Sequence, residues 1–280
     1  MRSTQLFALA AAATVPIAFL LALPAPGQTP PAELPRLADG TPDLNGIWQA
    51  LSTANYDILD HPASAGPFPE LLGAVGAVPA GRGIVDGNEL PYREWALEQK
   101  RVNFDTRLSA DPLDLTVGDP EAKCFMPGVP RANYMPFPFQ IIQGIDKVLV
   151  AYEFAHASRI VHMTDVGESP VDTWMGHSRG RWDGDTLVVD VTSQVADTWF
   201  DRAGNFHSAD MRVTERWTRT GIDHIQYEAT IEDPGVFTRP WTMRFPLYRR
   251  VESDAAIHEF RCVEFAEPFI LGTLSNPPIK

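Results

Sequence analysis

The pattern of apolar and polar positions changes at Phe139. From there on, apolar residues recur at every second position in short segments, which is the period of a strand with one buried face. In the segment 210–219, for example, Met211, Val213 and Trp217 alternate with polar residues. The segments that we predict as strands are 139–143, 147–154, 158–163, 178–183, 185–193, 210–219, 223–232, 240–249 and 256–265.

Turn-forming residues separate these segments. Gly144, Gly184 and the string Asp233-Pro234-Gly235 lie at three of the boundaries. Short strands joined by tight turns are typical of an antiparallel meander, which hides its edges by closing or by folding onto a second sheet. We therefore predict a mainly β fold, in which an antiparallel meander closes into a β-barrel or a sandwich.

The chain before the meander predicts less regular structure. Residues 52–88 are rich in glycine, proline and alanine and predict a long irregular N-terminal excursion. Residues 89–103 predict one short helix, because Pro91 suits a first helical turn. Five prolines from Asp119 to Pro138 predict a chain that runs extended or turning there, since proline removes the donor that a helix needs.

The first 27 residues have the pattern of a secretory signal. Arg2 precedes an apolar run from Leu6 to Leu23, and Ala25 and Gly27 suit cleavage. An uncleaved membrane anchor is the alternative, because about 18 apolar positions nearly span a bilayer. We expect the cleaved protein to be periplasmic or secreted. The predicted organisation is a signal peptide at 1–27, a proline-rich lead-in at 28–42 and a single β-rich domain at 43–280.

The composition limits the partners. Hydrophobic residues make up 44% and charged residues 21% of the chain, as in ordinary globular proteins. The 36 acidic and 23 basic residues give a formal charge of -13, which argues against binding to nucleic acids or anionic lipids. No stretch after the leader is long and apolar enough to span a membrane, so we expect no insertion after signal removal. The oligomeric state stays open.

Two cysteines, Cys124 and Cys262, occur in the chain. In an oxidising compartment such a pair can form a disulfide. Two buried thiols are the alternative, because the sequence does not show whether the two side chains meet.

Glu215 is the first candidate for chemistry. It shares the predicted inward face with Val213 and Trp217, where a carboxylate is costly unless it is paired or protonated. Burial would raise its pKa and favour a role as general acid or base. The structural alternative is an ion pair with an arginine such as Arg159, Arg244 or Arg249.

The loop 197–208 supplies two more candidates, Asp201 and His207. A carboxylate and an imidazole on a loop beside a rigid barrel could transfer protons near neutral pH. The alternative is a turn in which both side chains bond to the backbone. Acyl transfer by Ser208 is disfavoured because Ser208 does not stand in a G-x-S-x-G string.

Several residues could surround a substrate of such a catalyst. Trp199, Trp174 and Tyr227 would shape an aromatic pocket, and Arg159 would hold an anionic group. We predict no cofactor and no metal, because the histidines lack the spacing of known metal motifs. Metal binding by His156, His162 or His177 nevertheless stays open.

The string Leu44-Asn-Gly-Ile-Trp48 resembles the Gly-x-Trp start of lipocalin-like barrels. This resemblance implies that Trp48 closes one end of the barrel beneath an arginine of the last strands. Arg249 or Arg250 would take that place.

Longer strings resemble a large group of exported bacterial proteins that are described as uncharacterised. The resemblance implies export and a single β-rich domain, and it carries no activity. The strings are Pro42-Asp-Leu-Asn-Gly-Ile-Trp48, Lys123-Cys-Phe-Met-Pro-Gly-Val-Pro-Arg131, Trp174 to Asp190 and Thr214-Glu-Arg-Trp217.

Three functions follow as hypotheses. The first is an exported enzyme that performs acid–base chemistry, as a dehydratase, isomerase, lyase or hydrolase, on a hydrophobic small molecule in a barrel pocket. The second is a binding or carrier protein for such a molecule. The third is a structural module of the cell envelope, for which we expect no cavity as large as about 300 Å³.

Overall fold

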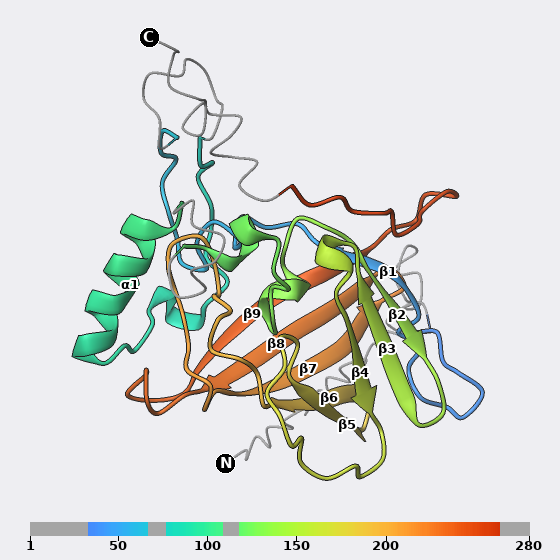
Figure 1. Cartoon of the computed structure of the whole chain (residues 1–280). Helices are drawn as coiled ribbons and strands as arrows, with labels where there is room; N and C mark the ends of the chain where they lie inside the picture. The colour runs from blue at the N-terminus through green and yellow to red at the C-terminus, as the bar shows by residue number, and fades with distance from the viewer. Residues whose placement is uncertain (1–32, 67–76, 109–117, 264–280) are drawn as a thin grey trace, which may run out of the picture. The chain divides into compact units, whose positions relative to one another are not determined.

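A computed structural model describes residues 33–66, 77–108 and 118–263. In this part of the chain nine strands form a closed barrel (Figure 1). They are β1 (Gly46–Ala50), β2 (Phe139–Gln143), β3 (Lys147–Tyr152), β4 (Ser158–His162), β5 (His177–Asp183), β6 (Thr186–Thr192), β7 (Arg212–Gly221), β8 (His224–Glu232) and β9 (Trp241–Arg249). The prediction of a mainly β fold that closes into a barrel is confirmed. The predicted signal peptide, 1–27, lies outside the described residues.

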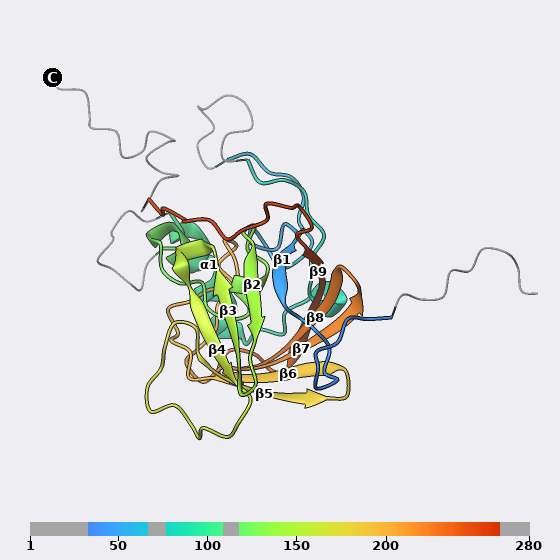
Figure 2. The same ribbon diagram turned by 90° about the vertical axis from the view of Figure 1, so that its right-hand side faces the viewer.

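The strand order follows the chain, and β1 closes the ring by pairing with both β2 and β9. Figure 2 shows β2–β4 on one side of the ring and the longer strands β7–β9 on the other. One pair departs from the predicted antiparallel meander, because β4 and β5 are parallel. The residues 163–176 between them form a connection long enough to return the chain before β5 begins.

Aromatic and aliphatic side chains fill the barrel. Trp217 of β7, Tyr227 of β8 and Phe245 of β9 stand in one register row, and all three are buried. Such a row of large side chains packs the interior, because inward positions alternate with outward ones along each strand. The predicted inward face of these three strands is confirmed.

The described chain outside the barrel is mostly irregular. It contains the helix α1 (Glu94–Thr106) and four short 3₁₀ helices: η1 (Asp86–Asn88), η2 (Pro120–Lys123), η3 (Arg131–Asn133) and η4 (Phe154–His156). The predicted helix at 89–103 is therefore shifted toward the C-terminus. Residues 89–93 are not helical because they bond to the loop after β8, as in the bond from Arg93 N–H to Val236 O. None of the described helices is long and apolar enough to cross a membrane.

The predicted strand at 256–265 is wrong for residues 256–263, and its last two residues lie outside the described part. The edge of β9 is already occupied, since Leu247 pairs with Ala50 of β1. No strand edge of the closed ring is left for another partner. The chain instead leaves β9 as a coil, residues 250–263, which we call the C-terminal strap (Figure 1).

Trp48 is buried, and the arginine over its ring is neither of the two named from the Gly-x-Trp resemblance. The guanidinium of Arg219 is 5.6 Å from the ring centroid of Trp48, and the Trp48 indole N–H donates to Leu44 O. Arg219 shares the inward parity of Glu215 and Trp217 on β7. The assignment to Arg249 or Arg250 is therefore corrected to Arg219. Arg249 instead lies beside Gly46, where a Cβ atom would be 3.2 Å from its Nε.

Candidate functional site

Glu215 lies inside the barrel and is fully buried. Arg159 of β4 donates to both of its oxygens, at 2.7 Å from Nη1 and 2.9 Å from Nη2. The Tyr227 hydroxyl, at 2.8 Å, and the Asn133 amide, at 3.0 Å, also donate to Oε1. The prediction of an inward Glu215 is confirmed, and the ion pair with Arg159 is the alternative that the structure contains.

The same network continues to Tyr152. Its hydroxyl donates to Asn133 Oδ1 at 2.8 Å and accepts from Arg159 Nε at 3.1 Å. Burial raises the pKa of Tyr227 well above its usual value, and the charge of Glu215 adds to this effect, so the phenol remains a donor. Each polar side chain of the network is thus bonded to another member of it.

The space beside this network is small. The cavity next to Arg159 and Trp217 measures about 10 Å³, which is no more than the room for a single water molecule. Arg159 was expected to hold an anionic group of a substrate, and its anionic partner is Glu215. This cavity is therefore too small for a small-molecule ligand.

His207 belongs to a separate set of bonds. Its Nδ1–H donates to Ser208 O at 2.8 Å, and its Nε2 accepts from the Thr198 hydroxyl at 2.7 Å. Burial lowers the pKa of His207, so the imidazole is neutral at pH 7. These contacts fit the structural alternative, in which His207 holds the loop between β6 and β7.

Asp201 is also fully buried and organises another part of the same loop. It accepts hydrogen bonds from the backbone N–H groups of Ile58, at 2.9 Å, and Ala203, at 2.9 Å, and from the Asn205 amide at 2.6 Å. Burial and the nearby charge of Asp57 raise the pKa of Asp201 to about 7, although these hydrogen bonds act against them. No hydrogen bond or ion pair among the described residues joins Asp201, His207 and Glu215 to one another.

The two predicted substrate-binding tryptophans form no hydrogen bond with the network around Glu215. Trp199 is buried and forms an isolated bridge with Phe206. Trp174 packs on Phe125, with 5.0 Å between the ring centroids. Tyr227 bonds to Glu215 inside the barrel.

Of the three histidines considered as metal ligands, two come together. The ring centroids of His162 and His177 are 5.5 Å apart, at the end of β4 and the start of β5. Burial, followed by the charges of His177 and Lys147, lowers the pKa of His162. Within the described ranges, no group of three or more histidine, cysteine or acidic side chains could hold a metal ion.

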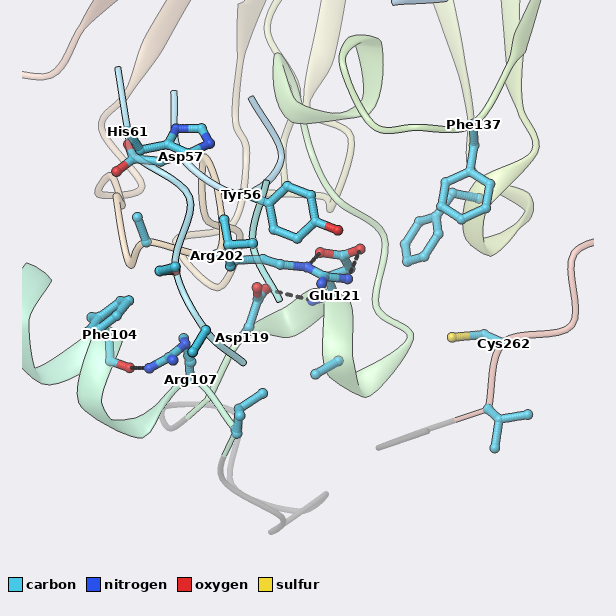
Figure 3. Close-up of a pocket in the computed structure, with 18 of the residues that line it drawn as sticks. Tyr56, Asp57, His61, Phe104, Arg107, Asp119, Glu121, Phe137, Arg202 and Cys262 are labelled. Atoms are coloured by element: carbon cyan, nitrogen blue, oxygen red, sulfur yellow. Dashed lines mark hydrogen bonds and ion pairs between the residues drawn. The ribbon is translucent and has the colours of Figure 1, made fainter. Parts of the chain in front are cut away.

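A larger pocket lies outside the barrel, and its volume of about 660 Å³ is typical of small-molecule sites (Figure 3). None of the described residues that line it belongs to a strand. They come from the loop after β1, the end of α1, η2, the chain before β2, η4, the loop after β6 and the C-terminal strap.

One side of the pocket is formed by a cluster of buried charges. Arg131 donates to Asp119 at 2.9 Å and to Glu121 at 2.7 Å. Arg202 also donates to Glu121, at 2.8 and 3.0 Å, and Asn55 donates to both oxygens of the same carboxylate. Figure 3 shows Arg202 and Glu121 facing each other at the pocket beside Tyr56.

The charges in this cluster hold Glu121 ionised. Burial acts to raise its pKa, but the charges of Arg202 and Arg131 prevail and lower it to about 2. The side chain of Arg202 is 34% exposed, whereas that of Arg131 is 1% exposed. The cluster thus presents one guanidinium to the pocket and keeps the other in the protein.

Tyr56 and Asp57 complete this polar side. The guanidinium of Arg202 lies 5.3 Å from the ring centroid of Tyr56. Asp57 accepts through Oδ1 from Leu59 N–H at 2.9 Å and from the Asn205 amide at 3.5 Å.

The opposite side is aromatic. The rings of Phe137, Phe154 and Phe260 form a triangle with centroid separations of 5.4, 4.8 and 5.0 Å. Phe137 precedes β2, Phe154 lies in η4 and Phe260 lies in the C-terminal strap. The pocket therefore combines a phenylalanine surface with a surface of tyrosine, aspartate and arginine.

The fold and the pocket define a class, a closed β-barrel with a ligand-sized pocket outside its ring. No family model, curated protein or solved structure matches the chain, so the geometry carries the argument about function.

Sequence reasoning missed the pocket residues. The string Lys123 to Arg131 points to this region, because it has two prolines yet carries charged residues that the structure buries. The contacts of Arg131 with Asn55 and of nearby Glu121 with Arg202 join distant parts of the chain, which periodicity does not report.

Proposed function

We propose that the protein binds a small, largely apolar molecule with a polar end in the pocket outside the barrel. The observation that carries this proposal is the phenylalanine triangle opposite Tyr56, Asp57 and Arg202. An apolar surface with a few polar groups on one side is the usual composition of a ligand site, since the polar groups fix the ligand's orientation.

The site also bears on the choice among the three hypotheses. A cavity of about 660 Å³ exceeds what a purely structural module requires. None of the three residues expected to perform acid–base chemistry, Glu215, His207 and Asp201, lines it. These points favour a binding or carrier protein.

Acid–base catalysis in the same pocket is the second candidate. Asp57 lines the pocket, and Asp201 lies behind it, joined through the Asn205 amide. A carboxyl whose pKa is raised to about 7, beside a second carboxylate, is an arrangement that acid–base enzymes use. Mass spectrometry of the bound ligand before and after incubation separates the two candidates, because a carrier returns it unaltered.

We also propose that the protein acts in the periplasm or outside the cell. The disulfide between Cys124 and Cys262 supports this compartment, since such bonds persist where the surroundings are oxidising.

The binding proposal is tested with 1-N-phenylnaphthylamine, an apolar dye that fluoresces when it leaves water. We expect saturable binding to the wild type and at least about a tenfold loss of affinity in Ala122→Trp. Ala122 lines the pocket, so the indole would fill the space. Ala209→Trp is the matched control, because Ala209 is exposed and does not line the pocket.

Two outcomes contradict the proposal. One is the absence of saturable dye binding in the folded wild-type protein. The other is equal dye affinity in Ala122→Trp and the wild type.

A further inference from the structure

The C-terminal strap is held by few attachments. It begins where Arg250 N–H bonds to Ile47 O of β1. Further along, His258 N–H donates to a carboxylate oxygen of Glu153 at 3.0 Å, and the Phe260 ring packs on Phe137 and Phe154. The last attachment is the disulfide between Cys262 and Cys124.

The strap forms part of the pocket. Phe260, Arg261, Cys262 and Val263 are all lining residues. In Figure 3 the chain that carries Cys262 stands across the pocket from Arg202 and Tyr56. Removing the strap would therefore remove one side of the binding site.

The disulfide connects this side to the charged one. Cys124 directly follows η2, whose Glu121 and Ala122 also line the pocket. The covalent bond thus fixes the strap to the turn that carries the charge cluster. It joins residues 138 positions apart, so no local structure would hold the two sides together in its place.

The remaining contacts of the strap are weak. Beyond Arg250 it is a coil that belongs to no strand, and Val251 and Val263 are 69% and 65% exposed. Segments with few buried contacts open locally at low free-energy cost. Both cysteines are only half-buried, so an attacking thiolate can reach the disulfide.

We propose that the Cys124–Cys262 disulfide is a redox-controlled tether that keeps the strap on the pocket, and that its reduction opens the pocket. This inference rests on the proposed binding function. When the disulfide is intact, the strap shields the apolar ligand from water. When it is reduced, the strap leaves, and the ligand dissociates faster.

The reductant that the step requires is a dithiol. One of its thiolates attacks a sulfur of the disulfide and forms a mixed disulfide, releasing the other cysteine as a thiolate. The second thiol of the reductant then displaces the first cysteine. The reductant ends as a disulfide, and Cys124 and Cys262 gain two electrons and two protons between them.

The test compares the oxidised full-length protein, the same protein reduced with dithiothreitol, and the variant Cys262→Ser. Hydrogen exchange measures the backbone amides of 256–263, and stopped-flow fluorescence measures dissociation of 1-N-phenylnaphthylamine. In both altered forms we expect amide exchange in the strap and dye dissociation to rise at least about tenfold. Exchange in β7–β9 should stay unchanged.

A variant with the disulfide intact separates the tether from the ring that it positions. Phe260→Ala should weaken dye binding but leave exchange in 256–263 less than about threefold faster. Equal strap exchange, or equal dye dissociation, in the oxidised and reduced proteins would overturn the tether. If the dye binds neither form, the binding function fails, while strap exchange still reports whether the disulfide holds the segment.

Discussion

Two buried arginine clusters use the same chemistry in different surroundings. Inside the barrel, Arg159 and Glu215 bond to each other and to neutral side chains, with exposed fractions of 2% and 0%. Beside the pocket, Arg131 and Arg202 share Glu121, and Arg202 is partly exposed. The first cluster is closed to any ligand, whereas the second borders the space in which a ligand would lie.

The most deeply buried charge therefore does not mark the proposed binding site. A carboxylate inside an apolar barrel attracts attention, but Glu215 has its full set of partners within the protein. The cluster at Glu121 looks less unusual in the sequence, yet it adjoins the larger cavity. Solvent access, rather than burial alone, distinguishes the two.

The largest effect is expected from the substitution Glu215→Gln inside the barrel. It leaves Arg159 as an uncompensated buried charge, so we expect the free energy of unfolding to fall by about 3–5 kcal/mol. Urea denaturation at pH 7 measures it. Arg216→Gln is the matched control on the same strand, because its pair with Asp183 is exposed and worth little. An unchanged stability in Glu215→Gln would return this residue to the list of catalytic candidates.

A somewhat smaller effect is expected at Glu121, and it depends on pH. The pKa of Glu121 is lowered from 4.5 to about 2 in the folded protein. A depressed pKa contributes stability that is complete above pH 4.5 and is lost as the pH falls toward 2. The shift corresponds to about 3 kcal/mol at neutral pH.

The measurement at Glu121 is the stability difference between wild type and Glu121→Gln across this pH range. We expect the difference to be largest near pH 6 and to shrink steadily below pH 4.5, where the carboxylate is protonated in the unfolded chain but stays ionised in the folded protein until the pH approaches 2. A difference that stays constant down to pH 2 would show that the carboxylate's charge contributes nothing.

The smallest effect is expected on the outer surface. Arg244 of β9 pairs with Glu228 and Asp86, and its side chain is 50% exposed. Arg244→Gln should lower the free energy of unfolding by about 0.2–1 kcal/mol, and 1 M NaCl should abolish the difference because salt screens exposed charges. If Arg244→Gln lowered the free energy of unfolding as much as Glu215→Gln, burial would not determine how much each set of ion pairs contributes to stability.

The sequence predicts much of the barrel because its pattern is local. Alternation with a period of two marks the strands after Phe139, and parity alone places Glu215 among inward apolar residues. The same parity extends to Arg219, which makes it the inward arginine for Trp48. Following the alternation from Trp217 to the next inward position would have identified Arg219.

The pocket could not be predicted in this way. Tyr56, Glu121, Phe154, Arg202 and Phe260 lie far apart in the chain, and none of them is in a strand or an α-helix. Their meeting depends on irregular segments whose path is set by tertiary contacts. For the disulfide, the compartment favoured the bond, but only the path of the strap brings Cys262 to Cys124.

The pairing of β1 with β9 has a consequence for the order of folding. Residues from Trp48 to Ala50 take their partners from Leu247 to Arg249, so the earliest strand waits for the latest one. A chain emerging from the ribosome or through a membrane pore therefore cannot complete its ring until nearly all of it is available. Contacts this distant in sequence slow folding, since a long loop must be closed before they form.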